Sequence, residues 1–372
     1  MIKAGFIGFG RMGITHFSIL NSHPDVEIVA VCDQSRMMLN ILKKYLSVAT
    51  YADYHQMMES ESMDCIIIST PSDSHSEIIR TAVENNMHVF CEKPFCLNTE
   101  DGKRIVENIN HKSLVNQVGY VNRFNEVFEE VKKLLEQNLI GDIRYFTSEM
   151  HGATVLKDSK SGWRSNRETG GGCLYDFGSH CIDLVVYLLG PPDRISGTIL
   201  QSVYSSEVED MVSSNFIYDN GIRGSVFINW SDETYRKPAN IITLFGTHGK
   251  IIADKHAVKI YLKESQPQQN LNKGWNTRYI TDFSKSVRMY VRGNEFTRQL
   301  DHFVSCISGN TLNNTIGFNE ALKTDIIIKN IIIDANPDQV KNADSDSVLL
   351  TDMQPKAKPM WRKILNGRGV SL

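Results

Sequence analysis

Three glycines near the start of the chain have the spacing of a phosphate-binding loop. Gly8, Gly10 and Gly13 form the pattern G-x-G-x-x-G, directly after a short apolar run and before a helix-length segment. In this context the first glycine allows a tight turn, the second lets a pyrophosphate approach the backbone, and the third lets the helix pack against the strand. The N–H groups at the start of the helix are available to phosphates. The pattern predicts a dinucleotide site that includes the intervening Arg11 and Met12.

Asp33 ends the second apolar run, about 20 residues after the glycine loop. A carboxylate at this place can accept hydrogen bonds from the adenosine ribose. It also repels a 2′-phosphate, which favours NAD over NADP, although Arg36 is near enough to weaken that preference. The alternative is that the glycines only permit a turn and that Asp33 caps the helix expected from Ser35. Because strand, glycines, helix and acid occur in register, we expect NAD as cofactor, with NADP as the second choice.

The segment Ser69, Thr70 and Pro71 ends another apolar run and is followed by His75. Open α/β sheets bind ligands at the carboxyl ends of their strands, so this loop is expected to face the cofactor. The alternative is a plain turn that caps the next helix, with a structural histidine.

Glu92, Lys93 and Pro94 also follow an apolar run. A lysine at a strand end can reach the ligand crevice, whereas a lone lysine elsewhere is usually a solvated charge. We assign Glu92 and Lys93 to the cofactor site, and Lys93 also to substrate binding and catalysis.

Asp176 and His180 follow a run of three glycines and stand four residues apart in a helix predicted over 176–189. This spacing places both side chains on one face of an α-helix. A carboxylate there can orient an imidazole and raise its basicity, which suits general acid–base catalysis. The alternative is that Asp176 caps the helix and that His180 is an ordinary buried polar residue.

These motifs together resemble the glucose–fructose oxidoreductase, inositol dehydrogenase and rhizopine-catabolism (Gfo/Idh/MocA) family, over nearly the whole chain. The segment from Tyr120 to Phe124 shares in the resemblance. It implies that Lys93 lies beside the nicotinamide and the substrate, and that His180 transfers the proton. It also implies an antiparallel sheet domain that commonly builds homodimers or homotetramers.

The resemblance has one departure near the expected substrate pocket. The family often has a proline two residues after the Arg-Phe pair, where this chain continues with asparagine and glutamate. Asn122 and Arg123 are candidate substrate contacts, as are Lys93, Asp176 and His180. Trp163 and Arg164, which precede the glycine run, are further candidates. The alternative is that Trp163 packs in the core and that Arg164 is a solvated charge.

The elements that must position these residues form two groups. Up to about residue 120, short apolar runs alternate with helix-length segments, which predicts a Rossmann doubly wound parallel sheet. The predicted strands cover 4–8, 27–32, 64–69, 88–91 and 114–119, and the helices cover 13–20, 35–45, 74–85 and 99–110.

After residue 142 longer strand patterns follow one another with turn signals between them, which predicts a large, mainly antiparallel open sheet in a C-terminal α/β domain. Expected strands cover 143–150, 194–204, 211–218, 222–230, 240–245 and 258–263, helices cover 125–138, 294–307 and 319–334, and 264–274 is a loop. The predicted domains are an NAD(P)-binding domain over 1–120, a substrate-binding and oligomerisation domain over 121–340, and a tail over 341–372.

The composition limits the ligand classes. The 372 residues are 41% hydrophobic and 22% charged, with a formal net charge of -3. This composition gives no excess of positive charge that would favour binding to nucleic acid. Export and membrane signals are not apparent, so a cytoplasmic protein without a membrane partner is expected. The seven cysteines form no C-x-x-C pair, so we expect reduced thiols and no metal.

The sequence therefore predicts an NAD(P)-dependent dehydrogenase that transfers a hydride between nicotinamide and a CH–OH carbon of a sugar, an inositol-like cyclic polyol or a sugar nucleotide. Two alternatives stay open. One is an NAD-dependent glycosidase that oxidises its sugar transiently. The other is a non-catalytic regulator that senses the cofactor.

Overall fold

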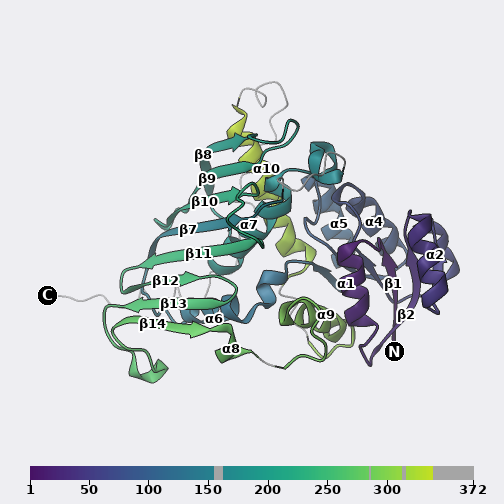
Figure 1. The fold of residues 1–372 in the computed structure, drawn as a ribbon, viewed down its shortest axis with the longest axis horizontal. Helices are drawn as coiled ribbons and strands as arrows, with labels where there is room; N and C mark the ends of the chain where they lie inside the picture. Colours follow the sequence, from purple (N-terminus) through teal and green to yellow (C-terminus); the bar gives the residue numbers. More distant parts are fainter. Residues whose placement is uncertain (155–161, 285, 312–315, 338–372) are drawn as a thin grey trace.

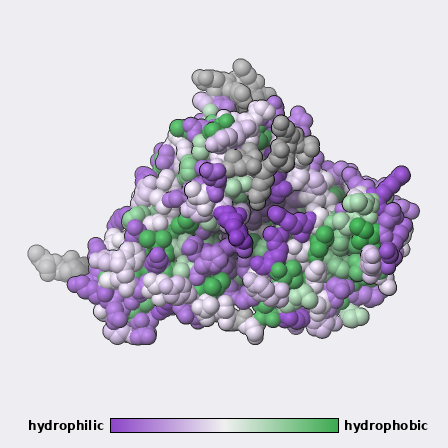
Figure 2. Space-filling model, viewed as in Figure 1, coloured by the Kyte–Doolittle hydropathy of each residue, from purple (hydrophilic) through white to green (hydrophobic). Residues whose placement is uncertain are grey.

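The computed structural model describes residues 1–154, 162–284, 286–311 and 316–337, so the predicted tail over 341–372 lies outside the described residues. Two sheets stand side by side (Figure 1), an N-terminal one flanked by helices and a larger, more open one. Strongly hydrophilic residues gather near the middle of the face drawn in Figure 2, between these two parts.

The N-terminal sheet has six strands in the order β3-β2-β1-β4-β5-β6, and every neighbouring pair is parallel. The strand order reverses direction between β1 and β4, which opens a crevice at the carboxyl ends of these strands. The predicted doubly wound sheet is confirmed. Its strands are β1 (Ile2–Ile7), β2 (Val26–Cys32), β3 (Ala49–Tyr51), β4 (Cys65–Ile68), β5 (His88–Cys91) and β6 (Asn116–Val118), and its helices are α1 (Arg11–Leu20), α2 (Arg36–Tyr45), α3 (Tyr54–Ser60), α4 (His75–Glu84) and α5 (Thr99–His111).

The central strands are apolar because both faces of this sheet are covered. Along β4, Ile66 and Ile68 join the core beneath α4 and α5, whereas Ile67 points to the other face and joins the core beneath α1. Helix α9 (Asn294–Ile307) contributes Phe303 to that second core, although it is distant in sequence from the sheet that it covers. The domain boundary at residue 120 stays a prediction.

The second sheet has eight strands in the order β14-β13-β12-β11-β7-β10-β9-β8. All neighbouring pairs are antiparallel except β7 with β10, which confirms the mainly antiparallel prediction. The bounds are β7 (Ile143–His151), β8 (Arg194–Gln201), β9 (Met211–Ile217), β10 (Arg223–Asn229), β11 (Ala239–Gly246), β12 (Gly249–Ala253), β13 (Ala257–Leu262) and β14 (Gly274–Tyr279).

Three helices pack on one face of this sheet (Figure 1): α6 (Glu126–Glu136), α7 (Ser179–Leu189) and α10 (Phe318–Ala335). A short helix, α8 (Ile280–Phe283), follows β14 at the sheet edge. The described residues include no helix long and apolar enough to cross a membrane.

The α-helix expected over 176–189 begins differently in the structure. A π-helical turn covers Leu174–Gly178, and the regular helix α7 starts only at Ser179. The turn is held by the segment between β8 and β9, because the carboxylate of Glu209 accepts a hydrogen bond from the backbone N–H of Leu174 at 3.0 Å. Asp176 therefore lies in the π-helical turn and His180 in the first turn of the regular helix, so the single α-helix expected over both residues is replaced by two kinds of turn.

A buried ion pair joins the segment after β6 to α7. The Arg123 guanidinium donates to the Asp183 carboxylate at 2.7 to 3.1 Å, and the two side chains are only 4% and 1% exposed. The guanidinium also lies over the ring of Tyr187, 5.3 Å from its centroid. The pair thus fixes the segment that follows β6 against α7.

Replacing Arg123 with Met should leave the Asp183 carboxylate buried without its counter-charge. Breaking a buried pair in this way typically costs about 3 to 5 kcal/mol. Denaturation in urea should therefore show a marked loss of stability. Arg144→Met is the matched control, because Arg144 pairs with Asp142 at 3.1 Å where both side chains are more than 60% exposed. Equal small losses in the two variants would contradict the structural role of Arg123.

Candidate active site

A cavity of about 790 Å³ lies along the carboxyl ends of the parallel strands and reaches the π-helical turn of the second part. Most of the residues that the sequence assigns to the site line it: Gly8, Gly10, Arg11, Met12, Asp33, Ser69, Thr70, Pro71, Glu92, Lys93, Trp163, Arg164 and Asp176. The other assigned residues, Gly13, His75, Asn122, Arg123 and His180, are not part of this lining.

The glycine loop combines two crowded positions with one open position. At Gly8 the φ angle is +86°, and a Cβ atom would lie 2.8 Å from the Ser69 carbonyl. A Cβ atom on Gly13 would lie 2.1 Å from the Gly8 oxygen. At Gly10, in contrast, a Cβ atom would have no neighbour within 4 Å, so the loop leaves open space on the cavity side. Gly10 also caps α1 without a side chain, which leaves the first N–H groups of the helix available to phosphate.

Asp33 ties the glycine loop to the end of β2. Its Oδ2 atom accepts from the Phe9 N–H at 2.6 Å, and its Oδ1 atom accepts from the Ser35 N–H at 2.7 Å. The side chain that caps α2 is Ser35, whose hydroxyl accepts from Met38 at 3.3 Å. A carboxylate has about four acceptor positions, so these two bonds leave capacity for ribose hydroxyls.

His75 bridges the loops that follow β4 and β5. It is fully buried, with Nδ1 at 2.9 Å from the Pro94 carbonyl oxygen and Nε2 at 3.1 Å from the Thr70 carbonyl oxygen. Burial lowers the pKa of His75. The histidine thus holds together the loops that follow β4 and β5, and Ser69 of the first loop lines the cavity while its hydroxyl is buried.

Lys93 connects the end of β5 to the π-helical turn. Its Nζ atom donates to the Asp176 carboxylate at 2.8 Å and to the Asp176 carbonyl at 2.6 Å. The second carboxylate oxygen of Asp176 accepts from Arg164 Nε at 2.8 Å. Burial alone would raise the pKa of Asp176, but the charges of Lys93 and Arg164 outweigh it and hold that pKa well below its usual range. The cavity therefore contains an ionised carboxylate between two cations.

His180 lies in the first turn of α7, near enough to Lys93 and Asp176 for their charges to act on its ring. Its ring meets Tyr120 edge to face, with 6.2 Å between centroids, and its backbone oxygen accepts from Asn240 at 3.3 Å. Burial and the charge of Lys93 lower the pKa of His180 to about 3. The ring of His180 is therefore neutral near neutral pH. The carboxylate of Asp176 is bonded to Lys93 and Arg164, so the structure does not show the orientation of His180 by Asp176 that helix spacing predicted.

Among the candidate substrate contacts, the two from the segment after β6 lie apart from the cavity lining. Arg123 is occupied in its ion pair with Asp183, and Asn122 precedes it in the same short turn. Trp163 and Arg164, in contrast, lie together at the cavity, with the guanidinium 4.5 Å from the indole centroid.

Sequence reasoning missed two residues that support the site. His16 in α1 makes a buried 2.6 Å contact through Nε2 with Glu92 Oε1, and Glu209 holds the start of the π-helical turn. A histidine on the apolar face of α1 was a usable signal for the first contact. No local pattern predicts the contact of Glu209, because Glu209 lies 35 residues from Leu174, whose N–H donates to it.

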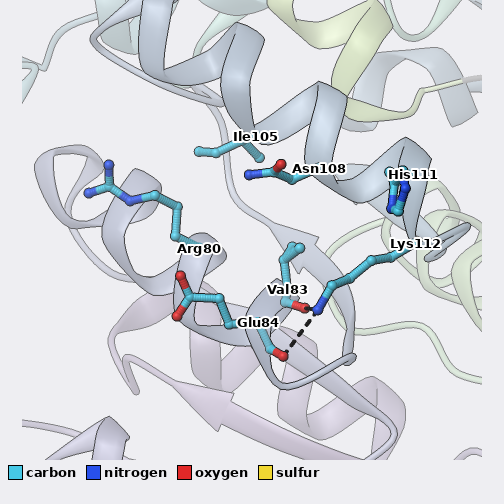
Figure 3. Close-up of a pocket in the computed structure, with 7 residues that line it drawn as sticks. All are labelled: Arg80, Val83, Glu84, Ile105, Asn108, His111 and Lys112. Carbon is cyan, nitrogen blue, oxygen red and sulfur yellow. Dashed lines mark hydrogen bonds between the residues drawn. The ribbon is translucent and has the colours of Figure 1, made fainter.

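A second, smaller cavity of about 250 Å³ lies between α4 and α5 (Figure 3). Lys112 closes one end by donating to the carbonyls of Val83 at 2.8 Å and Glu84 at 3.1 Å, which stabilises the carboxyl end of α4. None of the sequence motifs reaches this cavity. Within the described ranges there is also no group of three metal-ligating side chains. The larger cavity is therefore the candidate active site.

Proteins with similar sequences have names that describe activity on sugars or polyols. The chain is similar to the myo-inositol 2-dehydrogenase of Thermotoga maritima, with 26% identity over 259 residues that cover 68% of this chain and 75% of the relative. It is also similar to the 2,7-anhydro-N-acetylneuraminate hydratase of Escherichia coli, with 27% identity over 260 residues that cover 68% of each protein.

Solved structures share the fold. The WlbA dehydrogenase of Bordetella pertussis, in complex with NADH and UDP-GlcNAcA, aligns with a TM-score of 0.79 and 22% identity over 90% of this chain and 96% of that one. A levoglucosan dehydrogenase in complex with NADH and levoglucosan aligns with a TM-score of 0.78 and 20% identity over 90% and 97% of the two chains.

Two family models match the two parts of the molecule. A model described as an oxidoreductase family with an NAD-binding Rossmann fold matches residues 2–120. A model of the GFO/IDH/MocA C-terminal domain matches residues 128–252. With the Rossmann crevice, the glycine loop and the cluster around Lys93 in one cavity, these matches show that the chain belongs to the Gfo/Idh/MocA family of NAD-dependent oxidoreductases.

Proposed function

We propose that this chain oxidises a CH–OH group of a sugar, a cyclic polyol or a sugar nucleotide, with NAD as the hydride acceptor. The observation that carries the proposal is the position of Lys93. Lys93 lines the same cavity as the open glycine loop, and its ammonium group is fixed by Asp176 at 2.8 Å and is near His180. A cation, an ionised carboxylate and a neutral imidazole are the groups that such an oxidation needs.

The residues of the crevice fit a dinucleotide. The open space at Gly10 and the N–H groups at the start of α1 would hold the pyrophosphate, and Asp33 would bind the adenosine ribose. The loop from Ser69 to Pro71 and Glu92 line the continuation of the cavity. NAD, when bound, supplies the hydride acceptor. We infer NAD rather than NADP because the Asp33 carboxylate would repel a 2′-phosphate.

The protein groups would handle the proton and the oxygen. As the substrate carbon loses its hydride, the hydroxyl proton would pass to the neutral ring of His180, and the C–O bond would become a carbonyl. The Lys93 ammonium would donate a hydrogen bond to the reacting oxygen and stabilise its developing negative charge. Asp176, held by Arg164, would keep Lys93 in place and offer its carboxylate to a neighbouring hydroxyl. Trp163 would line the sugar site beside Arg164.

A second reaction class uses the same site without net redox change. The similarity to a protein named as a hydratase, which by that name catalyses no net oxidation, supports an NAD-dependent glycosidase as the second candidate. Such an enzyme would release an alcohol or a phenol while NADH does not accumulate. The third class, a cofactor-sensing regulator, has no need for the arrangement of Lys93, Asp176 and His180.

The proposal is tested with inositols, free sugars and nucleotide sugars, by measuring NADH absorbance. We expect sustained NADH formation with one of these substrate classes. Product release without NADH would favour the glycosidase class. Tight NAD binding without turnover of any compound would favour the regulator.

The open face of the second sheet fits the proposed homodimer or homotetramer. Cross-strand neighbours Tyr145 and Phe245, and further along Tyr261 and Trp275, are 37 to 56% exposed on this face. Burying such aromatic side chains against a second copy would be favourable. A cytoplasmic location stays a prediction from the sequence.

Lys93→Met should lower kcat by about 100-fold or more, because the reacting oxygen loses its charged hydrogen-bond donor. Steady-state kinetics with the substrate found above would measure the loss. Lys112→Met is the control, since Lys112 bonds only the carboxyl end of α4 and Asn86 around the smaller cavity. A loss within about tenfold, or about 1.4 kcal/mol of barrier, would rule out the role given to Lys93.

Asp33→Ser should shift cofactor preference toward NADP, because the repulsive charge is removed while a hydroxyl remains to accept a hydrogen bond. The measured quantity is the ratio of kcat/KM with NAD to that with NADP. Asp53→Ser is the matched control, since Asp53 also accepts a hydrogen bond from the backbone two residues on, at 2.8 Å from His55. If the ratio is the same in wild type and Asp33→Ser, Asp33 does not face the ribose.

Gly10→Val should fold normally but lose at least about tenfold in NAD affinity, since the added side chain enters open space where the pyrophosphate is expected. The backbone at Gly10, with φ of -72°, accepts a side chain without strain. Thermal unfolding and calorimetric titration separate the two effects. Gly13→Ala provides the contrast, because its added atom would collide with the Gly8 carbonyl and reduce stability. Unchanged NAD affinity in Gly10→Val would place the phosphates elsewhere.

A further inference from the structure

We propose that Glu92, held by His16, sets the relative affinity of the site for the oxidised and reduced forms of the nicotinamide cofactor. The inference rests on the proposed function, since it concerns the same cavity. It assigns a specific electrostatic task to a carboxylate that the hydride-transfer chemistry described above does not use.

The Glu92 carboxylate is held at the cavity wall by three sides of the protein. It is 8% exposed and lines the cavity next to Lys93. Its Oε1 atom lies 2.6 Å from His16 Nε2, and its Oε2 atom accepts from the Lys93 N–H at 3.3 Å. On the remaining side, a Cβ atom on Gly119 would lie 2.9 Å from Oε1, so the backbone after β6 packs directly on the carboxyl group. The charge therefore has little freedom to move away from the cavity.

Glu92 is ionised in this position. Burial would raise its pKa, but the hydrogen bond and charge of His16, together with the charge of Lys93, outweigh burial and lower that pKa. Among the nearby charges, Lys93 is engaged by Asp176 at 2.8 Å, and Asp176 is shared with the more exposed Arg164. Glu92 thus places a further carboxylate at the cavity wall. Its side chain is hydrogen-bonded to His16, and the charge of the Arg292 guanidinium also acts on it.

The strand order places Glu92 on the nicotinamide side of the crevice. Asp33 follows β2 on one side of β1, whereas Glu92 follows β5, two strands away on the other side. A dinucleotide crosses a Rossmann sheet where the strand order reverses, so adenosine at Asp33 directs the nicotinamide half toward β4 and β5. The same α1 that offers its first N–H groups to phosphate also supplies His16, which joins the two halves of the site.

The two cofactor forms differ in charge at the ring. Oxidised nicotinamide carries a positive charge and reduced nicotinamide carries none. A fixed carboxylate in a water-poor cavity interacts more strongly with the cationic form than it would in bulk water. Glu92 should therefore tighten NAD⁺ binding relative to NADH binding. This favours the NAD⁺-bound form of the enzyme, which is the form that can oxidise an alcohol.

The test measures the dissociation constants of NAD⁺ and NADH by calorimetric titration, without any substrate. Glu92→Gln keeps the shape and the acceptor for His16 but removes the charge. It should raise the ratio of the NAD⁺ to the NADH dissociation constant by at least about fivefold. Glu92→Asp keeps the charge on a shorter side chain and should give a ratio between those of wild type and Glu92→Gln.

Asp325→Asn is the control. Asp325 is 2% exposed and accepts from the Cys96 N–H at 3.0 Å, so it supports the same turn from α10 without lining the cavity. A purely structural disturbance of the turn would weaken the binding of NAD⁺ and NADH alike and leave the ratio of their dissociation constants unchanged. We expect this result for Asp325→Asn. The inference is overturned if Glu92→Gln binds both forms with the wild-type ratio, or if Glu92→Asp shifts the ratio as far as Glu92→Gln. A wild-type protein that binds neither form would instead refute the proposed function itself.

Discussion

The ion pair between Lys93 and Asp176 is the interaction on which the geometry of the site depends. Lys93 lies just after β5 of the parallel sheet and Asp176 lies in the π-helical turn of the second part, so one contact of 2.8 Å joins the two parts at the cavity. Both side chains are nearly buried, at 12% and 8% exposure. Removing charges from water is costly unless each charge is paired and hydrogen-bonded, and here Arg164 and two oxygens of Asp176 complete the pairing.

The sequence was most informative where local rules and packing agree. The strand at His88–Cys91 and the helix at Asn294–Ile307 have the predicted bounds, since each combines a clear apolar pattern with clear end signals. The edge strand β14 was missed because it is half exposed and polar, so it lacks the apolar alternation that marks a strand. The strand β12 was missed because it is only five residues long and begins at Gly249, the last residue of the turn predicted over 246–249.

The site was predicted where it depends on one loop and missed where it depends on distant partners. The glycine pattern is local, and its open and crowded positions follow from the backbone alone. The partners of Arg123 and Glu92 are 60 and 76 residues away in sequence, so their pairing with Asp183 and His16 was not visible. The helix spacing predicted a pairing of Asp176 with His180, but the bond of Asp176 to Lys93 was not visible, because Lys93 lies 83 residues away in sequence.

The most direct test of this account is hydrogen–deuterium exchange of the backbone in wild type and Lys93→Met. If Lys93 holds the π-helical turn across the cavity, amides of Leu174–Gly178 should exchange faster in the variant, although the mutation lies in the other part of the molecule. Exchange in the outer strands β8 and β9 should stay as in wild type. Unchanged exchange at Leu174–Gly178 would show that the ion pair does not join the two parts, and would contradict the central claim.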